Sequence, residues 1–231
     1  RWMPMEKWDA CSFAVNPDEL EGRVCYGGLD LSSTTDITAF VLVFPSQDED
    51  DKYAILPYFW VPEDTLELRV RRDHVPYDVW ERQGFLQTTE GNVVHYGYIE
   101  KFIERLGEKY NIREIAFDRW GAVQMVQNLE GMGFTVVPFG QGFKDMSPPT
   151  KELMKLTLEE RLAHGGHPVL RWMMDNIYIR TDPAGNIKAD KEKSTEKIDG
   201  AIATIMGLDR AIRCGNDTGA SVYDDRGILF I

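Results

Sequence analysis

Hydrophobic runs separated by short polar stretches dominate the first quarter of the chain. Two runs with strand character cover 24–31 and 36–44, and a third covers 53–60. The first two are joined by a short turn rich in Ser and Thr, and the third follows the acidic stretch 46–52. Consecutive strands joined by short turns pair antiparallel. The pattern therefore predicts a three-stranded antiparallel meander.

Further along the chain, hydrophobic positions at helical spacing alternate with short apolar runs. Helices are predicted at 62–72, 77–82, 98–110, 122–132, about 149–163 and 195–213, and strands at 112–117 and 134–139. The order strand, helix, strand is typical of a parallel crossover. The segments 176–182 and 186–190 flank a Pro-Ala-Gly turn and are expected to form a hairpin.

Three antiparallel strands, then parallel crossover strands and a closing helix, predict an α/β fold. It is a ribonuclease-H-like mixed sheet flanked by helices. Residues 1–22 lack a strong period, so we expect a linker or an arm packed against the domain. The domain itself is expected to span 23–214, and 215–231 is expected to be a C-terminal tail.

Composition narrows the class of protein only slightly. The chain has 231 residues, of which 43% are hydrophobic and 28% charged, as in ordinary globular proteins. No apolar run reaches the ~18–20 residues of a membrane span. The three cysteines form no Cys-x-x-Cys pair, which predicts neither a zinc knuckle nor a disulfide framework and fits a reducing cytoplasm. A net charge of −12 argues against coating nucleic acid, but phosphate contacts at an active site can be local.

Three aspartates stand where predicted elements meet. Asp30 ends the first strand, Asp118 ends the first crossover strand, and Asp199 lies in the first turn of the last helix, beside its apolar stripe. In the predicted sheet the first two stand at the ends of neighbouring strands, and the helix can bring the third over them. Carboxylates within ~4 Å repel by roughly 4 kcal/mol per pair at an effective dielectric of about 20, so divalent cations are the natural compensation. Two such ions on a phosphodiester stabilise the attacking water and the leaving oxygen, which predicts phosphodiester hydrolysis.

Each of these carboxylates also has an ordinary interpretation. An aspartate after a strand is most often a turn or capping residue, and Asp199 could favour a helix dipole. Asp36 opens the second strand and is expected to be a turn residue, with an outer-shell role left open. Glu196 lies one turn before Asp199 and is a minor candidate for metal contact. Only the joint arrangement of the three aspartates favours a metal site.

A basic run lies between the predicted hairpin and Asp199. It comprises Lys188, Lys191, Lys193 and Lys197. These side chains either form a solvated face or hold DNA phosphates beside the metal ions. His164 and His167 suggest a metal pair, but two histidines in a glycine-rich loop are more often solvated.

Four separated motifs resemble the nuclease domain of the large terminase subunit of tailed phages. They are GGLDLSSTTDITAFVLVF (27–44), IAFDRWGA (115–122), GQGFKDMSPPTKELMKL (140–156) and HGGHPVLRWMMDNIYIRTDPAGNIKADKEKSTEKIDGAIATIMGLDRA (164–211). Their order makes the resemblance specific, whereas any one alone would be weak. The resemblance implies a metal-dependent endonuclease that cuts concatemeric viral DNA during genome packaging. Asp30, Asp118 and Asp199 correspond to the family's acids, which bind two divalent ions (Mg²⁺ or Mn²⁺), and we expect Asp30 to bridge both.

The resemblance also implies the surroundings of the domain. Residues 1–22 would follow an ATPase domain that is absent here, and the start at Arg1 is expected of a fragment of a longer protein. The chain has no Gly-x-x-x-x-Gly-Lys-[Ser/Thr], so we expect no ATP hydrolysis. The implied partners are double-stranded DNA and, for the full-length protein, the portal and the small terminase subunit. We expect no membrane association, a monomeric isolated domain and a location in the host cell cytoplasm.

Three other functions are compatible with parts of the pattern. Residues 29–44 superficially resemble the phosphate loop of actin-type and sugar-kinase phosphotransferases, but Leu31 and Ser32 replace the glycine that close phosphate approach requires, and the chain is short for two domains. A non-catalytic docking module of the packaging motor is the second alternative. A junction resolvase or transposase of the same fold is the third.

Overall fold

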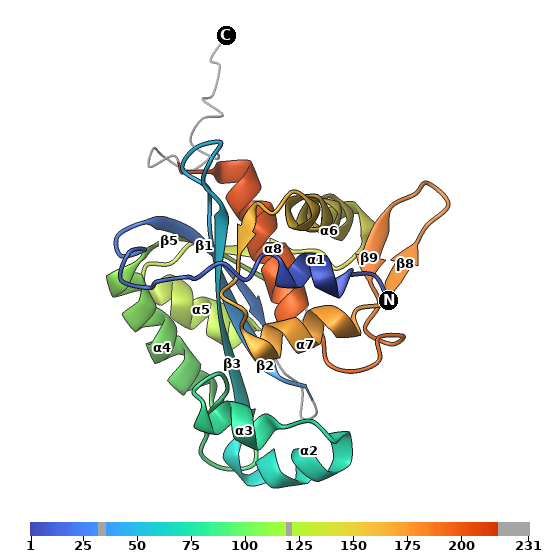
Figure 1. Ribbon diagram of the computed structural model, residues 1–231. Helices are drawn as coiled ribbons and strands as arrows, with labels where there is room; N and C mark the ends of the chain where they lie inside the picture. Colours follow the sequence, from blue (N-terminus) through green and yellow to red (C-terminus); the bar gives the residue numbers. More distant parts are fainter. Residues whose placement is uncertain (32–35, 119–121, 217–231) are drawn as a thin grey trace.

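The computed structural model describes residues 1–31, 36–118 and 122–216. A mixed sheet runs through the centre of the molecule, helices cover both of its faces, and a separate hairpin projects from one side (Figure 1). The strands are β1 (Val24–Asp30), β2 (Thr38–Phe44), β3 (Tyr53–Pro62), β4 (Gln87–Thr89), β5 (Asn111–Asp118), β6 (Val136–Phe139), β7 (Leu162–Ala163), β8 (Ile179–Thr181) and β9 (Ile187–Ala189).

The order of the sheet is β4-β3-β2-β1-β5-β6, and β7 also pairs with β3. β1, β2 and β3 pair antiparallel, whereas β5 and β6 join β1 in parallel. The predicted α/β sheet, with a meander followed by parallel crossover strands, is thereby confirmed. β4 and β7 were not predicted, because strands of three and two residues carry too little pattern to detect.

The central strands are buried on both faces, because neighbouring side chains of a strand point to opposite sides of the sheet. In β2, Val41 and Val43 belong to one hydrophobic cluster, and Phe40, Leu42 and Phe44 belong to the other. Strands covered on both faces carry near-continuous hydrophobic sequence. The uninterrupted apolar run of β2 therefore follows directly from its central place in the sheet.

Helices form one layer on each side of this sheet (Figure 1). They are α1 (Met5–Asp9), α2 (Leu66–Asp73), α3 (Tyr77–Arg82), α4 (Tyr96–Lys109), α5 (Val123–Gly131), α6 (Phe143–Leu158), α7 (Pro168–Asn176) and α8 (Asp199–Cys214), with a 3-10 turn at Glu63–Thr65. α8 packs directly on β1 and β2, and α6 and α7 pack against α8. α4 and α5 contribute to the hydrophobic cluster on the opposite face.

Small residues let α8 lie unusually close to β1. A Cβ atom on Gly28 would come within 1.8 Å of the carbonyl oxygen of Ala203, and a Cβ on Gly207 would lie 3.3 Å from the Gly28 nitrogen. Backbone atoms cannot move aside as a side chain can, so a larger residue at 28 would push the helix away from the strand. This close crossing fixes where the first residue of α8 lies relative to the end of β1.

The predicted boundaries of two helices were wrong. The helix expected at about 149–163 is α6, which begins at Phe143 and ends at Leu158. Pro149 was expected to mark its start, but burial of Met146 and its neighbours against the core extends the helix six residues toward the N-terminus, through Pro148 and Pro149. Tertiary packing thus outweighs the local signal.

The last helix begins at Asp199 rather than at the predicted 195. The amide of Thr195 donates to the carbonyl oxygen of Asn176, and the Asn176 side chain donates to the carbonyl oxygen of Lys197. Bonds to the end of α7 therefore hold this segment outside the helix. At the other end, Ile212 follows the apolar spacing of the helix but is exposed.

Residues 1–22 pack along the domain as an arm. Trp8 is fully buried and stacks on His164 with ring centroids 4.2 Å apart. The Asp9 carboxylate accepts two bonds from the Arg171 guanidinium, at 2.7 and 2.9 Å. His164 is therefore buried rather than solvated because the arm covers it, so the prediction was wrong for this residue, whereas Gly165 and Gly166 beside it are exposed.

No helix in the described part of the chain has the length and apolar character needed to cross a bilayer. The Ser-Ser-Thr-Thr turn at 32–35, the residues directly after Asp118, and positions 217–231 of the predicted tail lie outside the described residues.

Candidate active site

Two of the three predicted aspartates end adjacent parallel strands. Asp30 is the last residue of β1 and Asp118 the last residue of β5, and the register pairs Leu29 with Phe117 just before them. Parallel strands present the same ends at one edge of a sheet. Asp199 opens α8, whose close crossing of β1 brings it to this edge.

Asp30 and Asp199 form a buried pair. Their side chains are only 5% and 4% exposed, and the backbone N–H of Ile37 donates to Asp199 Oδ2 at 3.4 Å. Burial raises the pKa of both carboxyl groups, and repulsion between the two raises the pKa of Asp199 further. The charge on Asp118 also raises the pKa of Asp30. Such a pair holds a proton, or attracts a cation, more readily than separate carboxylates do.

A lysine ammonium stands against this pair. Lys191 Nζ lies 3.1 Å from Asp30 Oδ2 and 4.0 Å from Asp199 Oδ1. Burial disfavours the charge on Lys191, but the two carboxylates outweigh this effect and raise its pKa. Lys191 was predicted as a contact for DNA phosphates. Its pairing with Asp30 was missed, because nothing local in the sequence links residues 161 positions apart.

The turn that carries Lys191 is held by Asp190. Asp190 Oδ1 accepts bonds from the backbone N–H groups of Glu192 at 3.0 Å and Lys193 at 3.1 Å, and the carbonyl oxygen of Asp190 accepts from the Ser194 amide. These bonds lower the pKa of Asp190, so it stays ionised. The backbone of Lys191 is thereby fixed at the mouth of the site.

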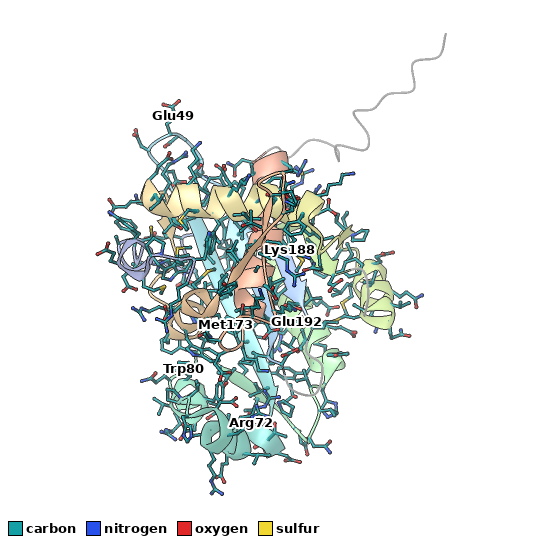
Figure 2. All side chains as sticks on the ribbon, turned by 90° about the vertical axis from the view of Figure 1, so that its right-hand side faces the viewer. Glu49, Arg72, Trp80, Met173, Lys188 and Glu192 are labelled. Carbon is teal, nitrogen blue, oxygen red and sulfur yellow. The ribbon has the colours of Figure 1, made fainter. Side chains whose placement is uncertain are left out.

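Two cavities meet at Lys191. One, of about 220 Å³, is lined by Asp36, Glu196 and Asp199, among others. The second, of about 270 Å³, is lined by Asp118 and Lys188, among others. Lys191 lines both of them. In Figure 2 the face that carries the hairpin is turned toward the reader, and Lys188 and Glu192 lie near its middle.

The remaining predicted residues have separate partners. Lys197 Nζ pairs with Asp36 Oδ1 at 3.1 Å, beside Asp199. Lys188 lies over the ring of Phe143 and Lys193 over that of Tyr178, at 4.9 and 5.7 Å from the centroids. Asp36 thus lies near the aspartate pair and is bound to a lysine. Of the four lysines in the basic run, Lys188 and Lys193 form no ion pair with a carboxylate of the described residues.

The two histidines have structural partners: His164 contacts the arm, and His167 caps helix α7. His164 Nδ1 accepts from the Gly166 amide at 3.0 Å, so Nε2 donates to the Trp8 carbonyl oxygen at 2.6 Å. His167 Nδ1 accepts from the Leu170 amide at the start of α7. Burial lowers the pKa of both rings. These contacts give both residues a structural role.

The carboxylates supply only oxygen donors, which suits a hard divalent cation. Across residues 1–31, 36–118 and 122–216, no three Asp, Glu, His or Cys side chains converge into a complete metal-binding group. Asp30 and Asp199 provide two converging carboxylates, and Asp118 faces the neighbouring cavity. The pair and its raised pKa values fit a cation, whereas the full three-aspartate set stays a prediction.

Comparison with known proteins identifies the family. The sequence model described as "Terminase large subunit, endonuclease domain" matches residues 1–214. The chain belongs to this family. It is 41% identical over 207 residues to "Terminase, large subunit" of Enterobacteria phage HK97, an alignment that covers 88% of the chain and 40% of that protein. It is 29% identical over 215 residues to "Protein YmfN" of Escherichia coli strain K12, an alignment that covers 89% of the chain and 47% of that protein.

Solved terminase structures have the same fold. The crystal structure of the HK97 bacteriophage large terminase matches with a TM-score of 0.82 at 38% identity, over 90% of this chain and 43% of that one. The large terminase nuclease of thermophilic phage G20c, solved with bound magnesium, matches with a TM-score of 0.54 at 13% identity, over 85% and 84%. The predicted ribonuclease-H-like fold and the resemblance to terminases are confirmed. This terminase domain spans less than half the length of the curated relatives it matches.

Proposed function

We propose that this domain is a metal-dependent endonuclease that cuts concatemeric viral DNA during genome packaging by two-metal phosphodiester hydrolysis. The observation that carries the proposal is the buried pair of Asp30 and Asp199 at the sheet edge where Asp118 also ends its strand. Membership in the terminase endonuclease family makes cleavage of DNA the reaction to expect of these acids.

Each acid has a distinct place in the proposed site. β1, which ends at Asp30, pairs with β5, which ends at Asp118, and is crossed by α8, which begins at Asp199. Asp30 is therefore assigned to contact both ions, and Asp118 and Asp199 would each hold one. Bound Mg²⁺ or Mn²⁺ supplies a Lewis acid for the scissile phosphate and an acidified water. The G20c nuclease, which shares the fold, was solved with magnesium. Glu196 and Asp36 line the cavity of Asp199 and are assigned supporting roles at most.

The lysines are the proposed contacts for DNA. Lys188 and Lys191 line the cavity that also holds Asp118, and Lys197 lines the cavity that holds Asp199. Lys193 lies on the turn that Asp190 closes, two residues after Lys191. With a net charge of −12, the chain has to bind phosphates locally rather than through its whole surface. Removing one such lysine should lower the salt dependence of DNA binding.

The wider setting of the domain belongs to the proposal as well. The full-length protein would carry an ATPase domain before residues 1–22 and would bind the portal and the small terminase subunit in the host cell cytoplasm. The isolated domain would bind double-stranded DNA as a monomer. The alternatives of a phosphotransferase and of a silent docking module predict no cleavage of DNA.

Nicking of supercoiled plasmid tests the proposal directly. With Mn²⁺ or Mg²⁺ the chain should convert the plasmid to open-circular and linear forms, and EDTA should stop the reaction. The variants Asp30→Asn, Asp118→Asn and Asp199→Asn should each lower the rate at least about 100-fold, because each removes a charged ligand of the ions.

A matched control is available on the same chain. Asp18→Asn makes the same chemical change at a largely exposed carboxylate that pairs with Lys109. This variant should cut at the wild-type rate. Retained cleavage in any of the three site variants, or cleavage that continues in EDTA, would contradict the assignment.

A further inference from the structure

The ammonium of Lys191 occupies the place where a cation between Asp30 and Asp199 would be most strongly attracted. It approaches both oxygens of Asp30, at 3.1 and 3.4 Å, and lies 4.0 Å from Asp199 Oδ1. Both carboxylates are buried, so most of their compensating charge has to come from what touches them. Lys191 therefore supplies charge that a divalent ion would otherwise supply.

The backbone that carries this lysine is anchored on both sides. On one side, Asp190 closes its turn by accepting the amides of Glu192 and Lys193. On the other side, the Asn176 side chain donates to the carbonyl oxygen of Lys197 at 2.9 Å. The anchoring keeps the Lys191 backbone close to the carboxylates whatever its side chain does.

The Lys191 side chain itself is half exposed to solvent. It is 47% exposed, whereas the Asp30 and Asp199 side chains are 5% and 4% exposed. Four rotatable bonds let a lysine ammonium swing over several ångströms while its backbone stays fixed. The turn at Asp190 therefore fixes the backbone, while the charge sits at the end of a half-exposed side chain with four rotatable bonds.

A divalent ion and this ammonium cannot share the carboxylate pair. Both would lie within contact distance of Asp30 Oδ2, where like charges repel strongly at low dielectric. Lys191 also lines both the cavity next to Asp199 and the cavity next to Asp118. As long as it stays, its side chain stands between those two carboxylates.

We propose that Lys191 is a tethered competitor for the metal site, whose ammonium has to leave Asp30 and Asp199 before a divalent ion binds. This inference rests on the proposed function of the same carboxylates. It makes Lys191 a residue that sets the divalent-ion concentration at which the site fills. Its departure opens the space between the cavity lined by Asp199 and the cavity lined by Asp118.

The other lysines of the basic run do not share this position. Lys193 lies over the ring of Tyr178, and Lys197 pairs with Asp36. Lys193 is two residues from Lys191 and carries the same charge. Lys193→Gln is therefore a matched control that removes one positive charge from the same turn without touching the carboxylate pair.

Titration calorimetry with Mn²⁺, without DNA, measures the competition. Lys191→Gln should bind Mn²⁺ at least about tenfold more tightly than wild type, because the ion no longer displaces an ammonium. Lys191→Arg keeps the charge and should stay within about threefold of wild type, as should Lys193→Gln. Equal affinities for wild type and Lys191→Gln would overturn the competitor role and leave the metal site standing. Equal tightening in Lys193→Gln would overturn it too, and no Mn²⁺ uptake by any protein would overturn the proposed function with it.

A wild-type measurement covers the case in which Lys191→Gln does not fold. Reductive methylation, followed by peptide mass spectrometry, reports how available each lysine amine is. Adding Mg²⁺ should raise the methylation rate of Lys191 severalfold, since the amine is released from its carboxylates. The rate at Lys193 should not change. A Lys191 rate that is unchanged or lowered by Mg²⁺ would overturn the inference.

Discussion

β1 and α8 meet at two places that differ in almost every physical respect. In the middle of the strand, Gly28 lies against the backbone of Ala203 and Gly207, in a contact without charge and with no room for a side chain. At the end of the strand, Asp30 faces Asp199 with Lys191 beside them. The first contact fixes the distance between strand and helix. At the second, two buried carboxylates repel each other.

Along β1 and α8, the residues that hold the fold together are different from those that would bind the metal ions. The apolar crossing determines how far Asp199 lies from Asp30, so the geometry of the carboxylate pair is built where no chemistry takes place. At the carboxylates themselves, burial and mutual repulsion work against folding. Changes at the two contacts should therefore move stability in opposite directions.

The largest effect is expected at the apolar crossing. Gly28→Ala places a methyl group 1.8 Å from the Ala203 carbonyl oxygen, so strand or helix has to shift. We expect a loss of about 3 kcal/mol or more in the free energy of unfolding, measured by urea titration. Gly97→Ala is the control, because a Cβ on Gly97 meets nothing within 4 Å. It should be neutral or stabilising by up to about 1 kcal/mol. A Gly28→Ala variant as stable as wild type would show that the close approach is not needed.

A smaller effect of opposite sign is expected at the carboxylate pair. Burial raises the pKa of Asp199 to about 8, above the ordinary carboxyl value, so the folded state holds its proton more tightly than the unfolded state. The stability from this group is complete in acid and is lost as the pH rises from about 4 toward 8. Asp199→Asn removes that loss, and should stabilise the metal-free protein by about 1 kcal/mol at pH 8 and by less at pH 5.

Thermal unfolding of wild type and Asp199→Asn in EDTA, at pH 5 and pH 8, measures this difference. Asp18→Asn, at an exposed carboxylate, should stay within about 0.5 kcal/mol of wild type at both pH values. A gain in the Asp199→Asn variant that is larger at pH 5 than at pH 8 would contradict the electrostatic explanation.

The same contrast explains what could be read from the sequence. The meander was predictable because β2 is buried on both faces and its sequence is continuously apolar. Asp30 and Asp118 were predictable as neighbours because strand ends and sheet order follow from the pattern of elements. The crossing of α8 at Gly28 was not, since two glycines in separate segments do not indicate that they meet.

Other features depend on contacts between distant segments. α6 runs through Pro148 and Pro149 because its first turns are buried, and local rules predict a start there. Trp8 and His164 are buried against each other from positions 156 apart, so the arm was predictable only as an alternative to a linker. The positive charge of Lys191 near the site could be predicted from the sequence. Its partner Asp30 could not, because the turn at Asp190 determines where the side chain lies.

The central claim is that the Asp30–Asp199 pair binds the ions that cut DNA. Anomalous diffraction from a crystal of this domain soaked in Mn²⁺ tests it most directly. The account predicts a manganese peak coordinated by carboxylate oxygens of Asp30 and Asp199, with Lys191 Nζ moved away from Asp30. A manganese peak elsewhere, or a fully occupied Lys191–Asp30 contact at saturating Mn²⁺ with no peak between the two aspartates, would contradict it.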